Sequence, residues 1–439
     1  MTDHHVSPFP PEFVWGVSTS AYQIEGASGE DGRGESVWDR FCTVPGVVRN
    51  GESGEIACDF YHRYPEDVEL MRELGVDTFR FSISWPRVLP EGRGRVNEAG
   101  LDFYDRLVDA LLAAGIEPWP TLFHWDLPQR LEDAGGWPER ATTEAFAEYA
   151  EAVAARLGDR VTWWITHNEP RVMSQLGYGE GIFAPGRRSD ADALAAAHHL
   201  LLSHGLAAAV LRRDVPGAKI GIALDLTDAV PATDSEADRD AARRLDGTIN
   251  RLFLDPVLRG SYPDDLPQPF GGEIDDADLR TISAPLDFLG VNYYHRQVVR
   301  APGEAELVVS PQGFTDVLVR LRDEYAPPAI VVTENGTSFG DAVGHDGRVR
   351  DPERQAYIAD HLDAVARALD AGVPVTGYLV WSLLDNFEWS DGYWKRFGLV
   401  YVDFPTLERI PKGSFYWYRD FIARRHRAGA ARTAIAQRR

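Results

Sequence analysis

Two glutamates in the sequence occupy positions at which a carboxylate could do chemistry. Glu169 lies in the segment THNEP (residues 166–170) and Glu334 in the segment TENG (residues 333–336), and each segment closes a short apolar run. Burying a carboxylate without a partner is costly, so each glutamate must be solvated, hydrogen-bonded or functional. A single glutamate at the end of a strand is more often a structural hydrogen-bonding group. Two of them, each beside an asparagine, favour a catalytic pair.

Other uses of paired carboxylates require partners that the sequence lacks. Metal-dependent hydrolysis needs histidines in a spacing such as H-x-H or H-E-x-x-H. The candidate histidines have neither spacing; they are His124, His167, His198 and His199. No G-x-x-x-x-G-K-[ST] segment occurs, and no G-x-G-x-x-G segment follows a predicted strand. We therefore expect neither a metal nor a nucleotide cofactor.

Hydrolysis of a glycoside fits the two glutamates, because it needs one carboxylic acid to protonate the leaving oxygen and one carboxylate to act on the anomeric carbon. A sugar also needs flat apolar surfaces, and the chain has 12 Trp, 16 Tyr and 20 Phe. Side chains that can stack on a sugar or hydrogen-bond its hydroxyls follow four other predicted strands: Gln23, His124, Trp125, Asn292, Tyr294, Trp381, Glu388 and Trp389. Their joint placement at strand ends indicates a sugar site.

These residues are positioned by short apolar runs that alternate with longer amphipathic segments. The eight runs are Phe13–Ser18, Thr78–Phe81, Pro118–Leu122, Val161–Thr166, Lys219–Leu224, Asp287–Asn292, Ile330–Thr333 and Val375–Trp381. The amphipathic segments include Glu98–Gly115, Thr143–Leu157, Ala191–Arg213 and Pro352–Ala371. Because parallel strands need long crossovers, this α/β pattern predicts a closed (β/α)₈ TIM barrel, with a doubly wound open sheet as the alternative. In such a barrel the chemistry gathers at the C-terminal ends of the strands.

The composition disfavours several other classes of protein. The 439 residues carry a formal net charge of −23, and so acidic a surface repels nucleic acids and anionic membranes. The sequence has no apolar run of 18 residues that would predict a transmembrane helix, and its polar N-terminus does not resemble a signal peptide. Cys42 and Cys58 are too few for a disulfide scaffold, so we expect two free thiols in a cytoplasmic enzyme.

The whole chain, residues 1–439, is predicted to form a single domain. No long linker, low-complexity tract or internal repeat divides it. The core of the domain is expected at about residues 8–421. Residues 422–439 form a basic tail without acidic residues, for which a frayed, solvated terminus is favoured over an interaction arm.

Five segments along the chain form recognisable motifs. They are FVWGVSTSAYQIEG (residues 13–26), FRFSISWPR (79–87), NEP (168–170), TENG (333–336) and WSLLDNFEW (381–389), the last followed by KRFG (395–398). Together they resemble glycoside hydrolase family 1, the β-glucosidase and β-galactosidase family. The likeness extends from about Pro8 to Phe421, and several motifs in the same order make chance agreement remote.

The resemblance implies a single TIM barrel with extended βα loops that acts as a retaining β-glucosidase without metal or cofactor. It would hydrolyse terminal, non-reducing β-D-glucosyl residues from β-glucosides and cello-oligosaccharides, with cellobiose and aryl or alkyl glucosides as small-molecule substrates. Carried over residue by residue, the resemblance makes Glu169 the proton donor and general base and Glu334 the nucleophile. It makes Gln23, His124, Asn168, Glu388 and Trp389 the residues that bind the hydroxyls of the glycone, and Trp381 the platform for the sugar. The residues that would set the charge and position of the nucleophile are Arg80, Asn292 and Tyr294.

Three positions depart from the family pattern. Arg171 stands where Trp is common, His167 where Leu, Ile or Phe is more usual, and Phe60 where His is frequent. None of the three belongs to the catalytic pair. Because Arg171 lies in a region that faces the leaving group, it could favour a polar or acidic leaving group.

Several alternatives stay open within the resemblance. A β-galactosidase, a β-fucosidase or a transglycosylase could use the same scaffold and the same two glutamates. A carbohydrate-binding protein without catalysis would lack one of the two carboxylates, whereas both are present. Related 6-phospho-β-glycosidases have Ser near the position of Glu388 and Tyr at that of Phe397, so that only Lys395 of their three phosphate contacts is present here. The sequence therefore predicts an unphosphorylated sugar.

Overall fold

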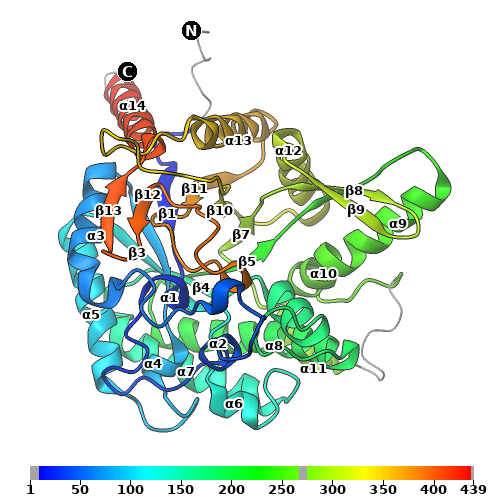
Figure 1. Cartoon of the computed structure of the whole chain (residues 1–439). Coiled ribbons are helices and arrows are strands. Elements are labelled where there is room, and N and C mark those ends of the chain that lie inside the picture. Colours follow the sequence, from blue (N-terminus) through cyan, green and yellow to red (C-terminus); the bar gives the residue numbers. More distant parts are fainter. Residues whose placement is uncertain (1–8, 266–273, 437–439) are drawn as a thin grey trace.

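Eight parallel strands close into a barrel at the centre of the molecule (Figure 1). The computed structural model describes residues 9–265 and 274–436. The barrel order is β1-β11-β10-β7-β5-β4-β3-β2, and every neighbouring pair is parallel. The strands are β1 (Val14–Ser18), β2 (Thr78–Ser82), β3 (Glu117–Phe123), β4 (Trp163–Asn168), β5 (Lys219–Asp225), β7 (Phe288–Asn292), β10 (Ile330–Asn335) and β11 (Val375–Trp381). All eight predicted runs are confirmed, and the open-sheet alternative is excluded.

Helices in the connections surround the barrel (Figure 1). The longer ones are α3 (Phe60–Leu74), α5 (Glu98–Ala113), α7 (Ala141–Leu157), α8 (Asp190–Asp214), α9 (Glu236–Asp246), α12 (Pro311–Arg320), α13 (Pro352–Asp370) and α14 (Gly413–Ala436). The shorter ones are α1 (Ala21–Ile24), α2 (Val37–Cys42), α4 (Trp85–Val88), α6 (Gln129–Asp133), α10 (Leu252–Arg259) and α11 (Asp276–Ile282). Five further turns, 3₁₀ or π in type, are η1 (Arg49–Gly51), η2 (Val172–Gly179), η3 (Gly247–Arg251), η4 (Leu321–Tyr325) and η5 (Trp389–Asp391). The four predicted amphipathic segments correspond to α5, α7, α8 and α13.

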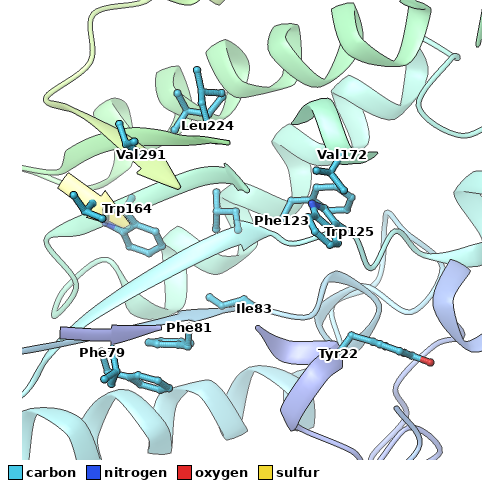
Figure 2. Packing of buried hydrophobic residues seen from close by; sticks show 14 of the residues in the cluster. Tyr22, Phe79, Phe81, Ile83, Phe123, Trp125, Trp164, Val172, Leu224 and Val291 are labelled. Atoms are coloured by element: carbon cyan, nitrogen blue, oxygen red, sulfur yellow. The ribbon is translucent and has the colours of Figure 1, made fainter. Parts of the chain in front are cut away.

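Two apolar layers hold the barrel together. Inside it, a small cluster joins side chains of different strands: Trp119, Ile165, Ala223, Phe288, Val331 and Leu379. Outside it, a larger cluster fills the space between strands and helices, and Figure 2 shows Phe79 and Phe81 of β2 packed beside a neighbouring helix. Between these two residues Arg80 points into the barrel, because successive side chains of a strand face opposite sides. The sequence FRF therefore places a charged group inside and two aromatic rings outside.

α7 and α8 show how the helices bury an apolar face. The predicted stripe of α7 is fully buried; it consists of Phe146, Tyr149, Ala150, Val153 and Leu157. Among the described residues, α8 is the one helix with the length and hydropathy of a membrane span, but 72% of its apolar window is buried inside the protein. It packs against α7, α11 and η2, so its apolar residues are explained by the protein core.

The connections contain strands that the sequence pattern did not predict. β6 (Asp228–Pro231), β8 (Arg296–Arg300) and β9 (Glu304–Val308) form a three-stranded sheet outside the barrel, and β12 (Val400–Asp403) pairs with β13 (Glu408–Pro411). All five are short and mostly half-buried or exposed, so they lack the apolar runs by which the barrel strands were recognised.

The basic tail begins as a helix and not as a frayed segment, whereas a frayed, solvated terminus was expected. α14 continues without a break to Ala436. Ile422 is buried, and the Arg425 guanidinium lies over the rings of Phe9 and Phe421, 5.5 and 4.7 Å from their centroids. Contacts with the first described residues thus order the start of this segment. Cys42 and Cys58 are both free thiols, as expected.

A buried ion network ties the loops that follow β10 and β11 to α13 and α14. The Lys412 ammonium, which is inaccessible to solvent, donates to Asp341 of the first loop and to Asp385 of the second, the latter at 2.7 Å. Arg354 of α13 donates to Asp341 at 2.7 Å, and Arg396 donates to Asp385 at 2.7 Å. Buried carboxylates need such partners, because an unpaired buried charge is strongly destabilising.

Replacing Lys412 by Met is expected to lower the free energy of unfolding by about 3–5 kcal/mol, because the side-chain volume is kept while two buried carboxylates lose a cation. Lys219→Met is the matched control, since Lys219 is half exposed and its nitrogen lies 3.5 Å from Asp287. The Lys219→Met substitution should lower the free energy of unfolding by no more than about 1 kcal/mol. Urea denaturation followed by tryptophan fluorescence measures both, and equal losses would contradict the assigned role of Lys412.

Candidate active site

A cavity of about 400 Å³ opens at the C-terminal ends of the barrel strands, and both glutamates line it. Glu334 belongs to β10 and Glu169 directly follows β4; both are buried. Other predicted residues that line the cavity are His124, Tyr294, Trp381, Glu388 and Trp389. The remaining predicted residues, Gln23, Arg80, Asn168 and Asn292, are fully buried beside them. The structure thus gathers all eleven at one end of the barrel, as the sequence predicts.

Both glutamates lie at irregularities of the barrel. The register between β10 and β7 shifts between Val332 and Glu334, and the register between β4 and β5 shifts between Ile165 and Asn168. Such local disruptions re-aim side chains and are common beside active sites. Glu169 also has φ +46, a left-handed conformation that is uncommon for residues other than glycine.

The Glu334 carboxylate is held by two donors. The Arg80 guanidinium donates to its Oε1 at 2.6 Å, and the Tyr294 hydroxyl donates to its Oε2 at 2.6 Å. Arg80 has no exposed surface, and it also donates at 2.6 Å to the side-chain oxygen of Asn168. Both Glu334 oxygens are therefore fixed by groups that favour the ionised carboxylate.

The Glu169 carboxyl has a different partner. The Asn292 amide donates to its Oε1 at 2.6 Å and to the Asn168 side-chain oxygen at 3.0 Å. The resemblance predicts that Asn292 supports Glu334, and a hydrogen bond from the Asn292 side chain does lower the pKa of Glu334. The same amide group also serves Glu169. The reason is local: the Thr333 hydroxyl donates to the Asn292 oxygen at 2.6 Å, so the amide nitrogen points toward β4.

The two carboxyls are held in different protonation states. Burial raises the pKa of Glu169 well above its usual value, and the negative charges of Asp225 and Glu334 raise it further. Burial also raises the pKa of Glu334, but Arg80 and the Tyr294 hydroxyl oppose that rise. The proton shared by the pair therefore resides on Glu169 and the charge on Glu334.

Arg171 forms a partly buried ion pair with Asp225, the last residue of β5. The sequence suggested that Arg171 could attract a polar or acidic leaving group. Its charge is instead compensated by Asp225, and Arg171 is not among the residues that line the cavity. The other two departures from the family pattern also serve packing. His167 hydrogen-bonds Ser203 at 2.8 Å, and Phe60 packs on Phe79 with ring centroids 6.1 Å apart.

The far end of the cavity combines a carboxyl group with aromatic rings. Burial raises the pKa of Glu388 to about 8, with Lys395 opposing the rise. The Gln23 amide holds this loop by donating to the Phe387 carbonyl at 2.9 Å and to Glu388 at 3.4 Å. The His124 ring is nearly parallel to the rings of Trp381 and Trp389.

His124 lines the cavity with a neutral ring. Burial lowers the pKa of His124 well below its usual value, so the ring is neutral. Its Nε2 lies 3.1 Å from the Asn168 amide nitrogen and must accept from it, which places the ring hydrogen on Nδ1. Nδ1 is buried and has no hydrogen-bond partner in the described part of the chain. Trp125, with φ +79, fixes the adjacent backbone because its indole donates to the Asn168 carbonyl at 2.9 Å.

Six lining residues were not identified from the sequence: His295, Leu307, Val309, Thr337, Ser338 and Tyr357. His295, Thr337 and Ser338 come directly after a predicted residue or motif, whereas the other three come from a hairpin and a helix that carry no strand-end signal. Of the histidines considered for a metal, only His124 lines the cavity. His198 hydrogen-bonds Tyr262, and His199 hydrogen-bonds the Trp137 carbonyl. Over residues 9–265 and 274–436, no three His, Cys, Asp or Glu side chains are grouped as metal ligands.

Comparisons with known proteins agree with this arrangement. The model of glycosyl hydrolase family 1 matches residues 5–307 and 301–427. Beta-glucosidase A of Acetivibrio thermocellus is 46% identical over 94% of this chain and 98% of its own length. A psychrophilic beta-glucosidase from Micrococcus antarcticus has a TM-score of 0.92 at 48% identity, covering 95% of this chain and 98% of that one. The Thermotoga maritima beta-glucosidase in complex with glucoimidazole has a TM-score of 0.91 at 43% identity, covering 95% and 99%.

Asp225→Asn is expected to move the higher of the two titration steps of the Glu169–Glu334 pair to lower pH. The substitution removes a negative charge and leaves the Arg171 cation unpaired, and both changes favour the ionised form of Glu169. Carbon NMR of protein labelled at the glutamate carboxyl carbons measures the shift, with Glu169→Gln identifying the resonance. Asp228→Asn, whose carboxylate pairs with Arg296, should leave the step in place. A step that does not move in Asp225→Asn would show that Asp225 does not act on Glu169.

Proposed function

The chain belongs to glycosyl hydrolase family 1 and is a retaining β-glucosidase, and we propose that Glu334 is its nucleophile and Glu169 its acid/base residue. It hydrolyses terminal, non-reducing β-D-glucosyl residues, for which cellobiose and aryl or alkyl glucosides are the proposed substrates. One observation carries the assignment of roles. Two buried carboxyls face one cavity, and one is held by a cation and a hydroxyl while the other is held by a neutral amide.

In the first step the Glu334 carboxylate attacks the anomeric carbon. Glu169 donates its proton to the glycosidic oxygen as the bond from that oxygen to the anomeric carbon breaks. The leaving group departs as an alcohol, and the glucosyl residue is bound to Glu334 as an ester. The Arg80 and Tyr294 contacts support this step, because they orient Glu334 and keep it ionised before the attack.

In the second step the ionised Glu169 takes a proton from water, and the resulting hydroxide oxygen attacks the anomeric carbon. Formation of the ester removes the negative charge of Glu334, which is one of the charges that hold the proton on Glu169. The pKa of Glu169 therefore falls in the intermediate, so the same residue can act as a base. Attack restores the Glu334 carboxylate and releases β-glucose.

The glycone is proposed to lie between the glutamates and Glu388. The unpartnered Nδ1–H of His124 can donate to a sugar hydroxyl, and Glu388, with its pKa of about 8, can donate as well as accept at neutral pH. The ring of Trp381 supplies an apolar surface at the same cavity. Such a buried site discriminates against a sugar that lacks one of the hydroxyls, because the protein group that would bind that hydroxyl is then left without a partner.

Glu334→Ala should lower kcat for p-nitrophenyl β-D-glucoside by at least about 10⁴-fold, since no covalent intermediate can form. Azide should restore turnover by occupying the space of the lost carboxylate, and the product should be α-glucosyl azide. Proton NMR of the azide product and of the first sugar released by the unaltered enzyme, expected to be β-glucose, decides the mechanism. Release of α-glucose would contradict it.

Glu169→Ala is the matched variant, and azide should act on it with the opposite stereochemistry. The glucosyl ester to Glu334 still forms with a good leaving group such as 2,4-dinitrophenolate, so an initial burst is expected before slow turnover. Azide then replaces the unactivated water on the other face of the sugar and yields β-glucosyl azide. The absence of a burst, with equal losses for all leaving groups, would argue that Glu169 is structural.

We expect kcat/KM for p-nitrophenyl β-D-glucoside to exceed that for its 6-phosphate by at least about 100-fold, because a phosphate bound beside Glu388 would be buried without a compensating cation, which costs several kcal/mol. The Lys395 ammonium, which lines the cavity, is already paired with Asp391 at 2.7 Å, so it adds little attraction for a phosphate. Glu388→Lys supplies a cation at this position and should narrow the ratio of the two kcat/KM values. Preference of the unaltered enzyme for the phosphate would overturn this assignment of the substrate.

A further inference from the structure

Two large apolar side chains, Leu307 and Val309, line the cavity although most of their surface faces solvent. Their exposed fractions are 62% and 58%, whereas Trp381 and Trp389 in the same cavity are each 3% exposed. A contiguous apolar surface at the rim of a binding site marks a place where a partner or ligand is bound. Neither residue takes part in the reaction described above.

The β8–β9 hairpin presents these side chains. In Figure 1 it extends away from the barrel near α9 and α12. Leu307 lies on β9 and Val309 directly follows it, and alternate residues of an extended chain point to the same side. Val308 points to the other side, and it does not line the cavity although it is 37% exposed.

The hairpin is on the side of the cavity away from the proposed glycone groups. It follows β7, whereas Gln23, His124 and Glu388 follow β1, β3 and β11. In the closed barrel β4 and β10, which carry the two glutamates, separate β7 from β3 and from β11 respectively. A glucosyl residue at Glu388 therefore directs its leaving group past the glutamates toward Leu307 and Val309.

Resting on the proposed function, we propose that Leu307 and Val309 form the surface that binds the leaving group of the substrate. The enzyme accordingly prefers glucosides whose leaving group is an extended apolar chain over those whose leaving group is a second sugar. This surface is continuous with the cavity that holds the catalytic glutamates. The one cation suggested for the leaving group by the sequence, Arg171, is paired with Asp225 and does not line the cavity.

The test compares methyl, hexyl and octyl β-D-glucosides with cellobiose, using the full-length protein. The three simple alcohols leave with similar ease, so differences among them report contacts with the chain rather than chemistry. We expect kcat/KM for hexyl β-D-glucoside to exceed that for the methyl compound by about tenfold, because a pocket contact with methylene groups is worth at least that factor. It should also exceed kcat/KM for cellobiose. The gain should appear mainly as a lower KM.

The double variant Leu307→Asn/Val309→Asn removes the apolar surface. It should reduce the ratio of kcat/KM for hexyl β-D-glucoside to kcat/KM for the methyl compound to about twofold or less. Val308→Asn is the control on the other face of the hairpin, where it makes the same change from valine to asparagine as at position 309, and it should keep the ratio. Leu307→Met/Val309→Ile, which preserves the apolar surface, should also keep it. Thermal unfolding of each variant checks that the hairpin substitutions leave the fold intact.

The outcomes separate this inference from the function on which it rests. Equal kcat/KM values for all the glucosides in the unaltered enzyme, or an equal fall of the ratio in Val308→Asn, would overturn the inference and leave the β-glucosidase assignment in place. Failure to hydrolyse any of the glucosides would overturn both.

Discussion

The buried guanidinium of Arg80 is the group on which the active site depends. It lies inside the barrel with no exposed surface, and a charge in that position must be compensated. Its acidic partner is Glu334, and its second nitrogen fixes the side chain of Asn168, the residue before Glu169. One cation therefore orients the nucleophile and the segment that carries the acid. The difference in proton affinity between the two glutamates follows from the same placement, since Glu169 has only an amide donor.

The barrel explains how residues far apart in the chain reach this cation. Neighbouring parallel strands bring their C-terminal ends to one rim, so residues at the ends of β3, β4, β7, β10 and β11 line a single cavity. Register shifts beside both glutamates adjust where those side chains point. The loops after β10 and β11 are fixed separately, through the Lys412 network to α13 and α14. Catalytic residues are thus held by the barrel, whereas the loop that carries Glu388 is held by Gln23 and by an ion network outside the barrel.

The loop after β7 contributes side chains of a different kind to the lining of the cavity. Leu307 and Val309 of its hairpin are apolar and largely exposed, in contrast to the buried polar groups around the proposed glycone. The polar groups select through hydrogen bonds, which depend strongly on geometry, whereas apolar contact tolerates many shapes. This division fits an enzyme that recognises one sugar strictly and its leaving groups loosely.

The sequence by itself determined the barrel, the two glutamates and most of their neighbours. The apolar runs alternate with amphipathic segments so regularly that eight strands can be counted from the sequence. The motifs around Glu169 and Glu334 lie where two of those runs end. Tertiary structure decided which side chain contacts which. Asn292 contacts Glu169 because Thr333 holds its oxygen, and Arg171 is neutralised because Asp225 ends the adjacent strand. Leu307 and Val309 reach the cavity through a hairpin whose short, exposed strands carry no periodic signal. Local patterns encode burial and strand ends, but contacts between distant loops exist only after the barrel closes.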